Sequence, residues 1–196
     1  MKHKVKNIVR TVLVMVAIIA TMPFWLMARA GRFGLESFTT WGMLLSLLPG
    51  VLGIYLRRGY YVMTLKNCSW DCSIGFGSWF SKHSVYVESH VSIGAGCIVG
   101  MCCIGEGTLI GSNIDILSGR HQHGSAEYMG EKKESRACFS PVRIGKNAWI
   151  GNRAIIMADV GDNAIVGAGS VVVHAVPADA LVVGNPAVRK RNSTLE

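Results

Sequence analysis

Aliphatic or aromatic side chains recur at every sixth position over most of the C-terminal two thirds of the chain. Fourteen such residues fall in five registers of period six: Ile74, Phe80, Val87, Ile93, Val99, Ile104, Ile110, Ile116, Ile144, Ile150, Ile156, Val160, Val166 and Val172. An α-helix repeats every 3.6 residues and a strand every two, so neither element explains this spacing. Hexapeptide repeats are typical of a parallel β-helix, in which one residue in six points into the narrow centre of each coil.

The six-residue spacing is interrupted between registers. The step from Val99 to Ile104 is one residue short, and the step from Ile156 to Val160 is two residues short, so irregular corners are expected there. After Ile116 the pattern stops for about 25 residues, and the intervening segment is polar. A long polar loop that leaves a repeat is typically functional. We therefore expect an extruded loop at about 117–142.

Two apolar runs precede the repeats, at residues 11–28 and 41–56, and neither contains a charged side chain. Both are at or below the length that spans a bilayer core of ~30 Å. Each contains a proline, Pro23 or Pro49, which removes a helical hydrogen bond. Two arrangements stay open: the pair crosses the membrane and returns, or one or both runs are broken helices within a single leaflet. In the second arrangement five aromatic side chains would lie at the lipid headgroups, namely Trp25, Trp41, Tyr55, Tyr60 and Tyr61.

The net charge of +8 belongs entirely to the first third of the chain. Residues 1–66 contain nine Lys or Arg and one Glu, whereas the basic and acidic residues of the remainder cancel. The basic residues flank the apolar runs, with Arg57 and Arg58 closing the second, and do not spread over a folded face as in nucleic-acid binders. This pattern predicts contact with membrane lipids, excludes nucleic acid as a partner and places both ends of the segment in the cytoplasm.

We divide the chain into a membrane-anchoring helical segment at 1–66, a β-helix at 67–191 and a tail at 192–196. The motif Ala28-Arg29-Ala30 resembles a signal-peptide cleavage site. However, the first apolar run exceeds the ~7–15 residues usual for such signals, and a second run follows. The six cysteines show no paired zinc spacing and are expected to be buried thiols.

The repeat region resembles the hexapeptide-repeat acyltransferases over about residues 70–191, and more closely their sugar O-acetyltransferase branch. The most specific stretches are PVRIGKNAWIG at 141–151, GDN at 161–163, VGAGSVV at 166–172 and GNPA at 184–187. The resemblance implies a left-handed parallel β-helix of three hexads per turn, assembled as a homotrimer. It also implies acetyl-CoA as co-substrate and no metal. His174 and Val188 depart from the pattern, because relatives often carry basic contacts to coenzyme A there.

The extruded loop opens with Gly119-Arg120-His121-Gln122-His123. Acyl transfer to an alcohol needs a base, and a histidine can take the proton near neutral pH. The resemblance places the catalytic histidine at His121, with His123 as second choice. A carboxylate would orient the imidazole, and Asp115 and Glu127 are the candidates.

The resemblance places the donor in a groove between neighbouring coils of two subunits. Backbone groups near Asn152, Ala168 and Val173 would line this groove. Three basic residues after the last coil, Arg189, Lys190 and Arg191, would contact the phosphates.

These observations predict a membrane-associated O-acetyltransferase that acts on a sugar hydroxyl of a lipid-linked or surface polysaccharide precursor. Its place would be the cytoplasmic side of a bacterial inner membrane. Two alternatives stay open. One is a non-enzymatic β-helix scaffold at the membrane. The other is a zinc-dependent carbonic anhydrase, which needs three converging histidines, such as His83, His90 and either His121 or His123.

Overall fold

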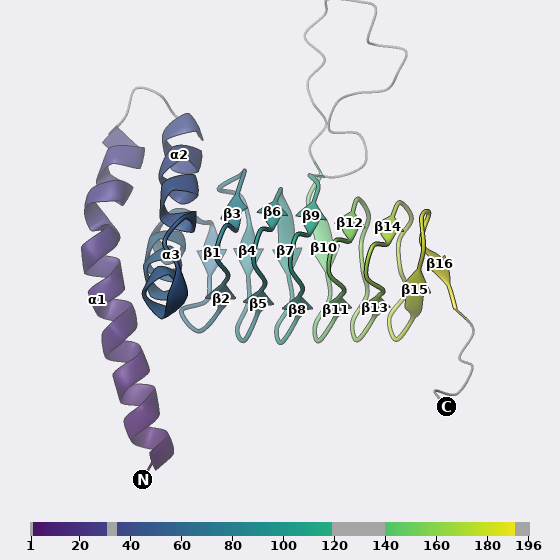
Figure 1. The fold of residues 1–196 in the computed structure, drawn as a ribbon, viewed down its shortest axis with the longest axis horizontal. Helices are drawn as coiled ribbons and strands as arrows, with labels where there is room; N and C mark the ends of the chain where they lie inside the picture. Colours follow the sequence, from purple (N-terminus) through teal and green to yellow (C-terminus); the bar gives the residue numbers. More distant parts are fainter. Residues whose placement is uncertain (1, 31–34, 119–139, 191–196) are drawn as a thin grey trace, which may run out of the picture.

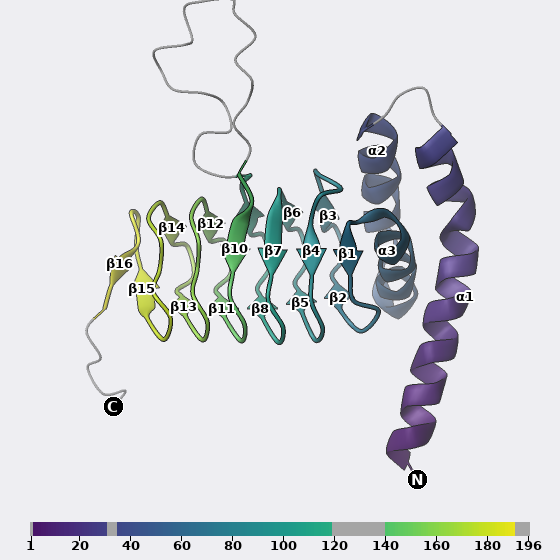
Figure 2. The same cartoon turned by 180° about the vertical axis from the view of Figure 1, so that it is seen from behind.

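A computed structural model describes residues 2–30, 35–118 and 140–190. Over these residues the chain forms a parallel β-helix of about five coils whose first coil is covered by three helices (Figures 1 and 2). The helices are α1 (Lys2–Ala30), α2 (Leu35–Ser46) and α3 (Gly50–Thr64). The strands are short, and each of the first four coils contributes one strand to each of three sheets.

The first sheet contains four parallel strands and the third contains five. The first holds β1 (Asn67–Cys68), β4 (Tyr86–Val87), β7 (Cys102–Ile104) and β10 (Val142–Ile144). The third holds β3 (Trp79–Phe80), β6 (Ile98–Val99), β9 (Asp115–Ile116), β12 (Ile155–Ile156) and β14 (Val171–Val172).

The second sheet contains seven strands, of which only the last pair is antiparallel. Its members are β2 (Ser73–Ile74), β5 (Ser92–Ile93), β8 (Leu109–Ile110), β11 (Trp149–Ile150), β13 (Ile165–Val166), β15 (Leu181–Val183) and β16 (Val188–Arg189). Because adjacent coils pair strand on strand, equivalent residues form columns along the axis: Ile110, Ile150 and Val166 follow one another in register.

The predicted inward positions are confirmed. All fourteen residues of the six-residue pattern are buried, none more than 4% exposed. The glycine after an inward residue is required by coil stacking: a Cβ on Gly151 would lie 2.5 Å from the backbone nitrogen of Ala168 in the next coil. At the shortest step, Val160 forms only an isolated bridge between Ile144 and Val176, which is the irregular corner that the spacing predicts.

The two apolar runs fold differently from each other. α1 continues through Pro23, and its segment Val9–Arg29 has a mean hydropathy of 2.2. By length and composition alone, it is the one helix within the described ranges able to cross a membrane. The second run is divided between α2 and α3, with Pro49 at the N-cap of α3. It therefore cannot form one continuous span.

The expected positions of several residues at the end of the second run were wrong. Arg57 and Arg58 are not exposed at the end of this run, and Tyr60 and Tyr61 do not lie at lipid headgroups, because all four side chains are buried. Arg57 donates hydrogen bonds to carbonyl oxygens of Ile74, Leu45, Ser46 and Leu48. These residues fix the helices onto the first coil.

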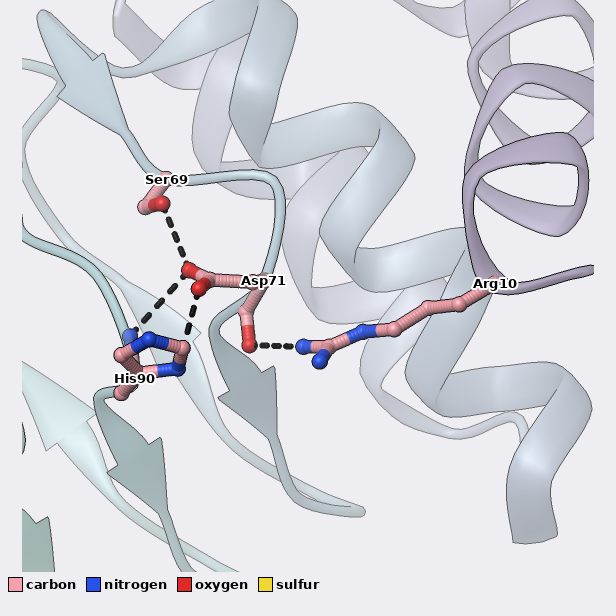
Figure 3. Close-up of polar contacts among 4 residues, drawn as sticks. All are labelled: Arg10, Ser69, Asp71 and His90. Atoms are coloured by element: carbon pink, nitrogen blue, oxygen red, sulfur yellow. Dashed lines mark hydrogen bonds and ion pairs between the residues drawn. The ribbon is translucent and has the colours of Figure 1, made fainter. Parts of the chain in front are cut away.

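A polar cluster fixes the turn between β1 and β2 (Figure 3). The Asp71 carboxylate accepts hydrogen bonds from the Ser69 hydroxyl at 2.6 Å and the His90 backbone N–H at 3.1 Å. It also lies 3.0 Å from His90 Nδ1, and the Arg10 guanidinium of α1 donates to the Asp71 carbonyl oxygen. Burial raises the pKa of Asp71. The Ser69 hydroxyl, the His90 backbone N–H and the nearby His90 and Arg10 side chains together lower it by more, so the net shift of the pKa is downward.

Asp71→Asn is expected to destabilise the fold most above about pH 5. A carboxyl group whose pKa is lower in the folded state contributes stability above its unfolded pKa, ~3.9, and loses it as the pH falls through the folded value. Loss of the charge-assisted hydrogen bonds is expected to cost about 1–3 kcal/mol at neutral pH. Midpoints of thermal unfolding for wild type and variant, measured from pH 7 to pH 3, should converge at the acid end. A difference that does not change with pH would assign the effect to packing.

Candidate active site

The extruded loop leaves the β-helix and returns to it at one point, which we call the neck, formed by Ser118 and Ser140. The Ser140 N–H donates to the Ser118 carbonyl oxygen at 3.2 Å. The Ser118 hydroxyl, 3% exposed, accepts a hydrogen bond from the Met101 N–H at 2.9 Å in the preceding coil. The Leu117 N–H donates to the Ile156 carbonyl oxygen in the following coil. The end of the coil before the loop is thus fixed to the coils on either side, and Ser140 is fixed to Ser118.

Asp115 lies in β9, three residues before the neck. Its backbone is paired with Ile98 in β6 and Ile155 in β12, and because Ile116 points inward, the half-buried Asp115 side chain is on the outer face of the third sheet. Among the described residues no hydrogen bond or ion pair holds its carboxylate. The predicted catalytic residues His121 and His123, and also Glu127, lie outside the described residues.

The predicted donor contacts fall on two edges of the third sheet. Asn152 precedes β12 and Ala168 precedes β14, and the Gly169 N–H donates to the Asn152 carbonyl oxygen at 2.8 Å, so these two residues are neighbours on adjacent coils. The Asn152 side-chain oxygen accepts from the Ser112 N–H at 2.8 Å, which orders this corner. Val173 follows β14 and lies on the opposite edge, which is the edge of the neck. The structure therefore does not gather the three around one point within the chain.

Two of the three predicted basic contacts are described. Arg189 lies in β16, where it pairs with Val182, and the Lys190 N–H donates to the Leu181 carbonyl oxygen at 2.8 Å. Both side chains are exposed at the end of the second sheet. Arg191 lies outside the described residues.

Two concave surfaces escaped the sequence reasoning. One lies on the first sheet and includes Arg143, Lys146, Asp159 and Asp162. Both of these aspartates accept backbone N–H bonds at 2.8 Å, from Arg143 and Lys146 respectively, which gives them a structural role. Because the basic and acidic residues of this part of the chain cancel, its net charge gave no indication of this surface.

The other concave surface lies where the helices meet the first coil. It is lined by Trp25, Arg29, Phe38, Met63 and His83, among others. His83 follows β3, in the same sheet as β9, so this cavity lies on the edge that carries the neck. Finding it from the sequence would have required knowing that α1 packs across this end.

The histidines proposed for zinc have other contacts. His90 pairs with Asp71 in the turn described above, and the His83 ring packs edge-on against Phe38. Within residues 2–30, 35–118 and 140–190 no three His, Cys, Asp or Glu side chains gather as a metal site. The five cysteines in those ranges are free, with Cys68, Cys72, Cys97 and Cys102 buried and Cys103 half-buried.

Comparisons with known proteins agree with the repeat pattern. Residues 141–173 match the family model described as the hexapeptide repeat of succinyl-transferase. Galactoside O-acetyltransferase of Escherichia coli is 34% identical over 42% of this chain and 40% of its own length. Nodulation protein L of Rhizobium leguminosarum bv. viciae is 34% identical over 64% of this chain and 57% of its own. The chain thus spans about half the length of the curated relatives it matches.

A solved structure shows the same fold. A hexapeptide-repeat acetyltransferase of Vibrio cholerae O1 biovar eltor, in complex with acetyl coenzyme A, superposes with a TM-score of 0.63 at 19% identity. The match covers 81% of this chain and 88% of that chain. In its repeat sequence and in its β-helix, the chain is therefore similar to the hexapeptide-repeat acetyltransferases.

Proposed function

We propose that the protein is a membrane-associated O-acetyltransferase that moves an acetyl group from acetyl-CoA to a hydroxyl of a sugar. The main support for the proposal is the position of the neck. In a chain similar to galactoside O-acetyltransferase and nodulation protein L, a segment containing Gly119-Arg120-His121 leaves the β-helix at a fixed point between two coils. The acetyl coenzyme A bound to the Vibrio cholerae protein supports this choice of donor.

In this proposal His121 is the general base. Its imidazole takes the proton of the sugar hydroxyl as the oxygen attacks the thioester carbonyl carbon. The tetrahedral intermediate then collapses, the carbon–sulfur bond breaks, and the coenzyme A sulfur leaves with the proton that the imidazole held. Asp115, three residues before the neck on the outer face, is the candidate to orient the imidazole, and His123 to contact the acceptor.

For the donor, the proposal uses the residues after the neck. Asn152 and Ala168 on adjacent coils would accommodate the pantetheine arm by their backbone groups. Val173, on the edge of the neck, would lie nearer to the acetyl group. Arg189, Lys190 and Arg191 would contact the phosphates by charge-assisted hydrogen bonds.

The acceptor in this proposal is a lipid-linked or surface polysaccharide precursor on the cytoplasmic side of a bacterial inner membrane. The apolar helix α1 supports membrane association. A soluble sugar would not require an anchor, whereas confinement to the membrane raises the effective concentration of a lipid-linked acceptor.

We further propose a homotrimer, in which two subunits would line each donor groove. Three neighbouring apolar side chains on the outer face of the second sheet support a subunit contact. Leu109, Trp149 and Ile165 lie on consecutive strands and are 52%, 57% and 38% exposed. An exposed column of this kind is typical of an interaction surface.

Trp149→Glu is expected to dissociate this assembly, because a carboxylate would then be buried at the subunit contact. Light scattering in detergent should show the mass fall from three chains to one, and acetyl transfer should fall with it. Phe76→Glu, at a comparably exposed apolar position in the turn between β2 and β3, serves as the control. Equal masses for wild type and Trp149→Glu would contradict this choice of interface.

The function is tested on the full chain in detergent with acetyl-CoA. Release of free thiol, measured with and without a pool of membrane glycolipids, reports hydrolysis and transfer. Calorimetric titration with coenzyme A reports donor binding independently of the acceptor. Binding together with glycolipid-stimulated thiol release is the expected result. If coenzyme A does not bind, the enzyme proposal fails and the scaffold interpretation takes its place.

A further inference from the structure

The apolar part of α1 contacts the β-helix near its start and shares a cavity with it near its end. Near its start, Arg10 donates a hydrogen bond to the carbonyl oxygen of Asp71, in the turn between β1 and β2 (Figure 3). Near its end, Trp25 and Arg29 line one cavity with His83, which follows β3. An α-helix rises about 27 Å over the 18 residues between these two contacts. The apolar run therefore lies across the N-terminal end of the β-helix, on the outer side of α2 and α3, and does not project from that end (Figure 1).

The middle of α1 is fixed by close packing on α3. A Cβ on Gly59 would lie 2.7 Å from the carbonyl carbon of Ala17, so the two helices touch backbone to backbone. Val14, Ala17 and Thr21 form the inward stripe of α1 and are at most 4% exposed. α3 is in turn fixed to the first coil by Arg57, which donates to the Ile74 carbonyl oxygen at 3.0 Å. The helices and the first coil thus form one packed unit.

The opposite face of α1 is apolar from Val9 to Met27. Nine large apolar side chains there are between 43% and 66% exposed: Val9, Val12, Leu13, Met15, Val16, Ile19, Met22, Leu26 and Met27. No charged residue occurs between Arg10 and Arg29. This face lies opposite the buried stripe of α1, and α1 is the outermost element at this end of the molecule (Figures 1 and 2). A continuous exposed surface of this kind requires an apolar environment.

We propose that α1 lies flat within one leaflet, with the β-helix axis along the membrane normal, and does not cross the bilayer; this inference rests on the proposed membrane association. An upright α1 would draw the first coils into the hydrocarbon together with Asp71, Glu88 and His90, and ionised side chains are costly there. A helix in the interface plane buries its apolar face by about 5–10 Å and leaves those groups in water. The lipid leaflet is thus the partner that the exposed face of α1 fits.

This orientation determines the height of the neck above the lipid. The neck follows β9, and β9 is separated from β3 in the first coil by one strand, β6. Two strand spacings of ~4.8 Å place the neck roughly 10 Å beyond the first coil, and the layer of α2 and α3 separates that coil from α1 by roughly another 8–10 Å. In this orientation the neck lies closer to the lipid than the last coils of the β-helix do.

Nitroxide labels on the outward face of α1 test the orientation. We would label single cysteines at Val12, Ile19 and Leu26, seven residues apart on one face, in a background with Cys103 and Cys138 changed to serine. The full chain is reconstituted in vesicles of phosphatidylethanolamine and phosphatidylglycerol. Collision with oxygen and with a water-soluble nickel complex gives the depth of each label. Val188→Cys, 62% exposed at the opposite end of the β-helix, is the control and should report water.

A flat helix predicts the same shallow depth for all three labels. A crossing helix places Ile19 about 10 Å deeper than Val12 and Leu26, because seven residues rise 10.5 Å in an α-helix, and this result would overturn the inference. Three water-exposed labels would overturn membrane association as well. Thiol release from acetyl-CoA, measured on the same vesicles, reports the acetyltransferase proposal separately, so that either proposal can fail alone.

Discussion

Replacing His121 with alanine is expected to slow acetyl transfer to the glycolipid acceptor by about 10²–10⁴-fold, which is the usual contribution of a general base. An alcohol is a poor nucleophile toward a thioester until its proton is removed during attack. His121 is the histidine that the family resemblance assigns to this step, two residues after the glycine that follows the neck. The measurement is thiol release at saturating acetyl-CoA and acceptor.

His123→Ala is the matched control for this prediction, because it removes the same side chain two positions further along the same loop. Loss of a contact with the acceptor would raise KM more than it lowers kcat, whereas loss of the base lowers kcat. Coenzyme A affinity should be unchanged in both variants, as measured by calorimetry. Full activity in His121→Ala would remove the proposed mechanism, and a larger loss in His123→Ala would exchange the two roles.

The β-helix was predictable because each of its coils obeys one local rule. An inward position such as Ile150 has no room for a polar group, and the adjacent Gly151 has no room for a Cβ. These restrictions repeat with the coil and therefore appear in the sequence as a period. Even the irregular corner at Val160 is visible as a short step. Nothing beyond neighbouring coils is needed to fix these residues.

The candidate site was predictable only in part. The neck could be located, since the repeat stops after Ile116 and resumes at Val142. The split of the donor contacts between two edges of one sheet depends on which corner each residue occupies. That assignment requires the strand pairing of β12 and β14 and not only the spacing.

The helices were harder to predict because their packing depends on distant segments. Tyr60 and Tyr61 resemble interfacial aromatic residues in the sequence, yet the Tyr60 hydroxyl donates to the Phe38 carbonyl oxygen at 2.9 Å, and the Tyr61 ring packs against Phe80. A buried tyrosine needs such a partner for its hydroxyl group. Because the partners lie about twenty residues away, no local pattern distinguishes a buried from an interfacial tyrosine here.

Arg57→Met is expected to destabilise the protein by about 3–5 kcal/mol. Arg57 lies in α3 and is fully buried. Its side chain lies at the C-terminal end of α2, where carbonyl groups have no partners within the helix. Its Nη1 donates to Leu48 at 2.7 Å and Leu45 at 3.2 Å, and its Nε donates to Ile74 at 3.0 Å. Burial lowers the pKa of Arg57, while the nearby Tyr61 raises it, and the net shift is downward. The guanidinium nevertheless stays charged at neutral pH and complements the α2 dipole.

Arg58→Met provides the contrast, because the two neighbouring arginines are both buried but differ in their partners. Arg58 stacks on the Tyr55 ring at 5.0 Å, and its Nε and Nη1 lack hydrogen-bond partners among the described residues, whereas in Arg57 only Nη2 lacks one. Replacing a poorly paired buried charge by an apolar side chain of similar size is often neutral or stabilising. Thermal unfolding in detergent should therefore show a midpoint lowered by about 10 °C for Arg57→Met and little changed for Arg58→Met. Equal losses would mean that the volume of each side chain, and not the pairing of the α2 carbonyls, holds the helices on the β-helix.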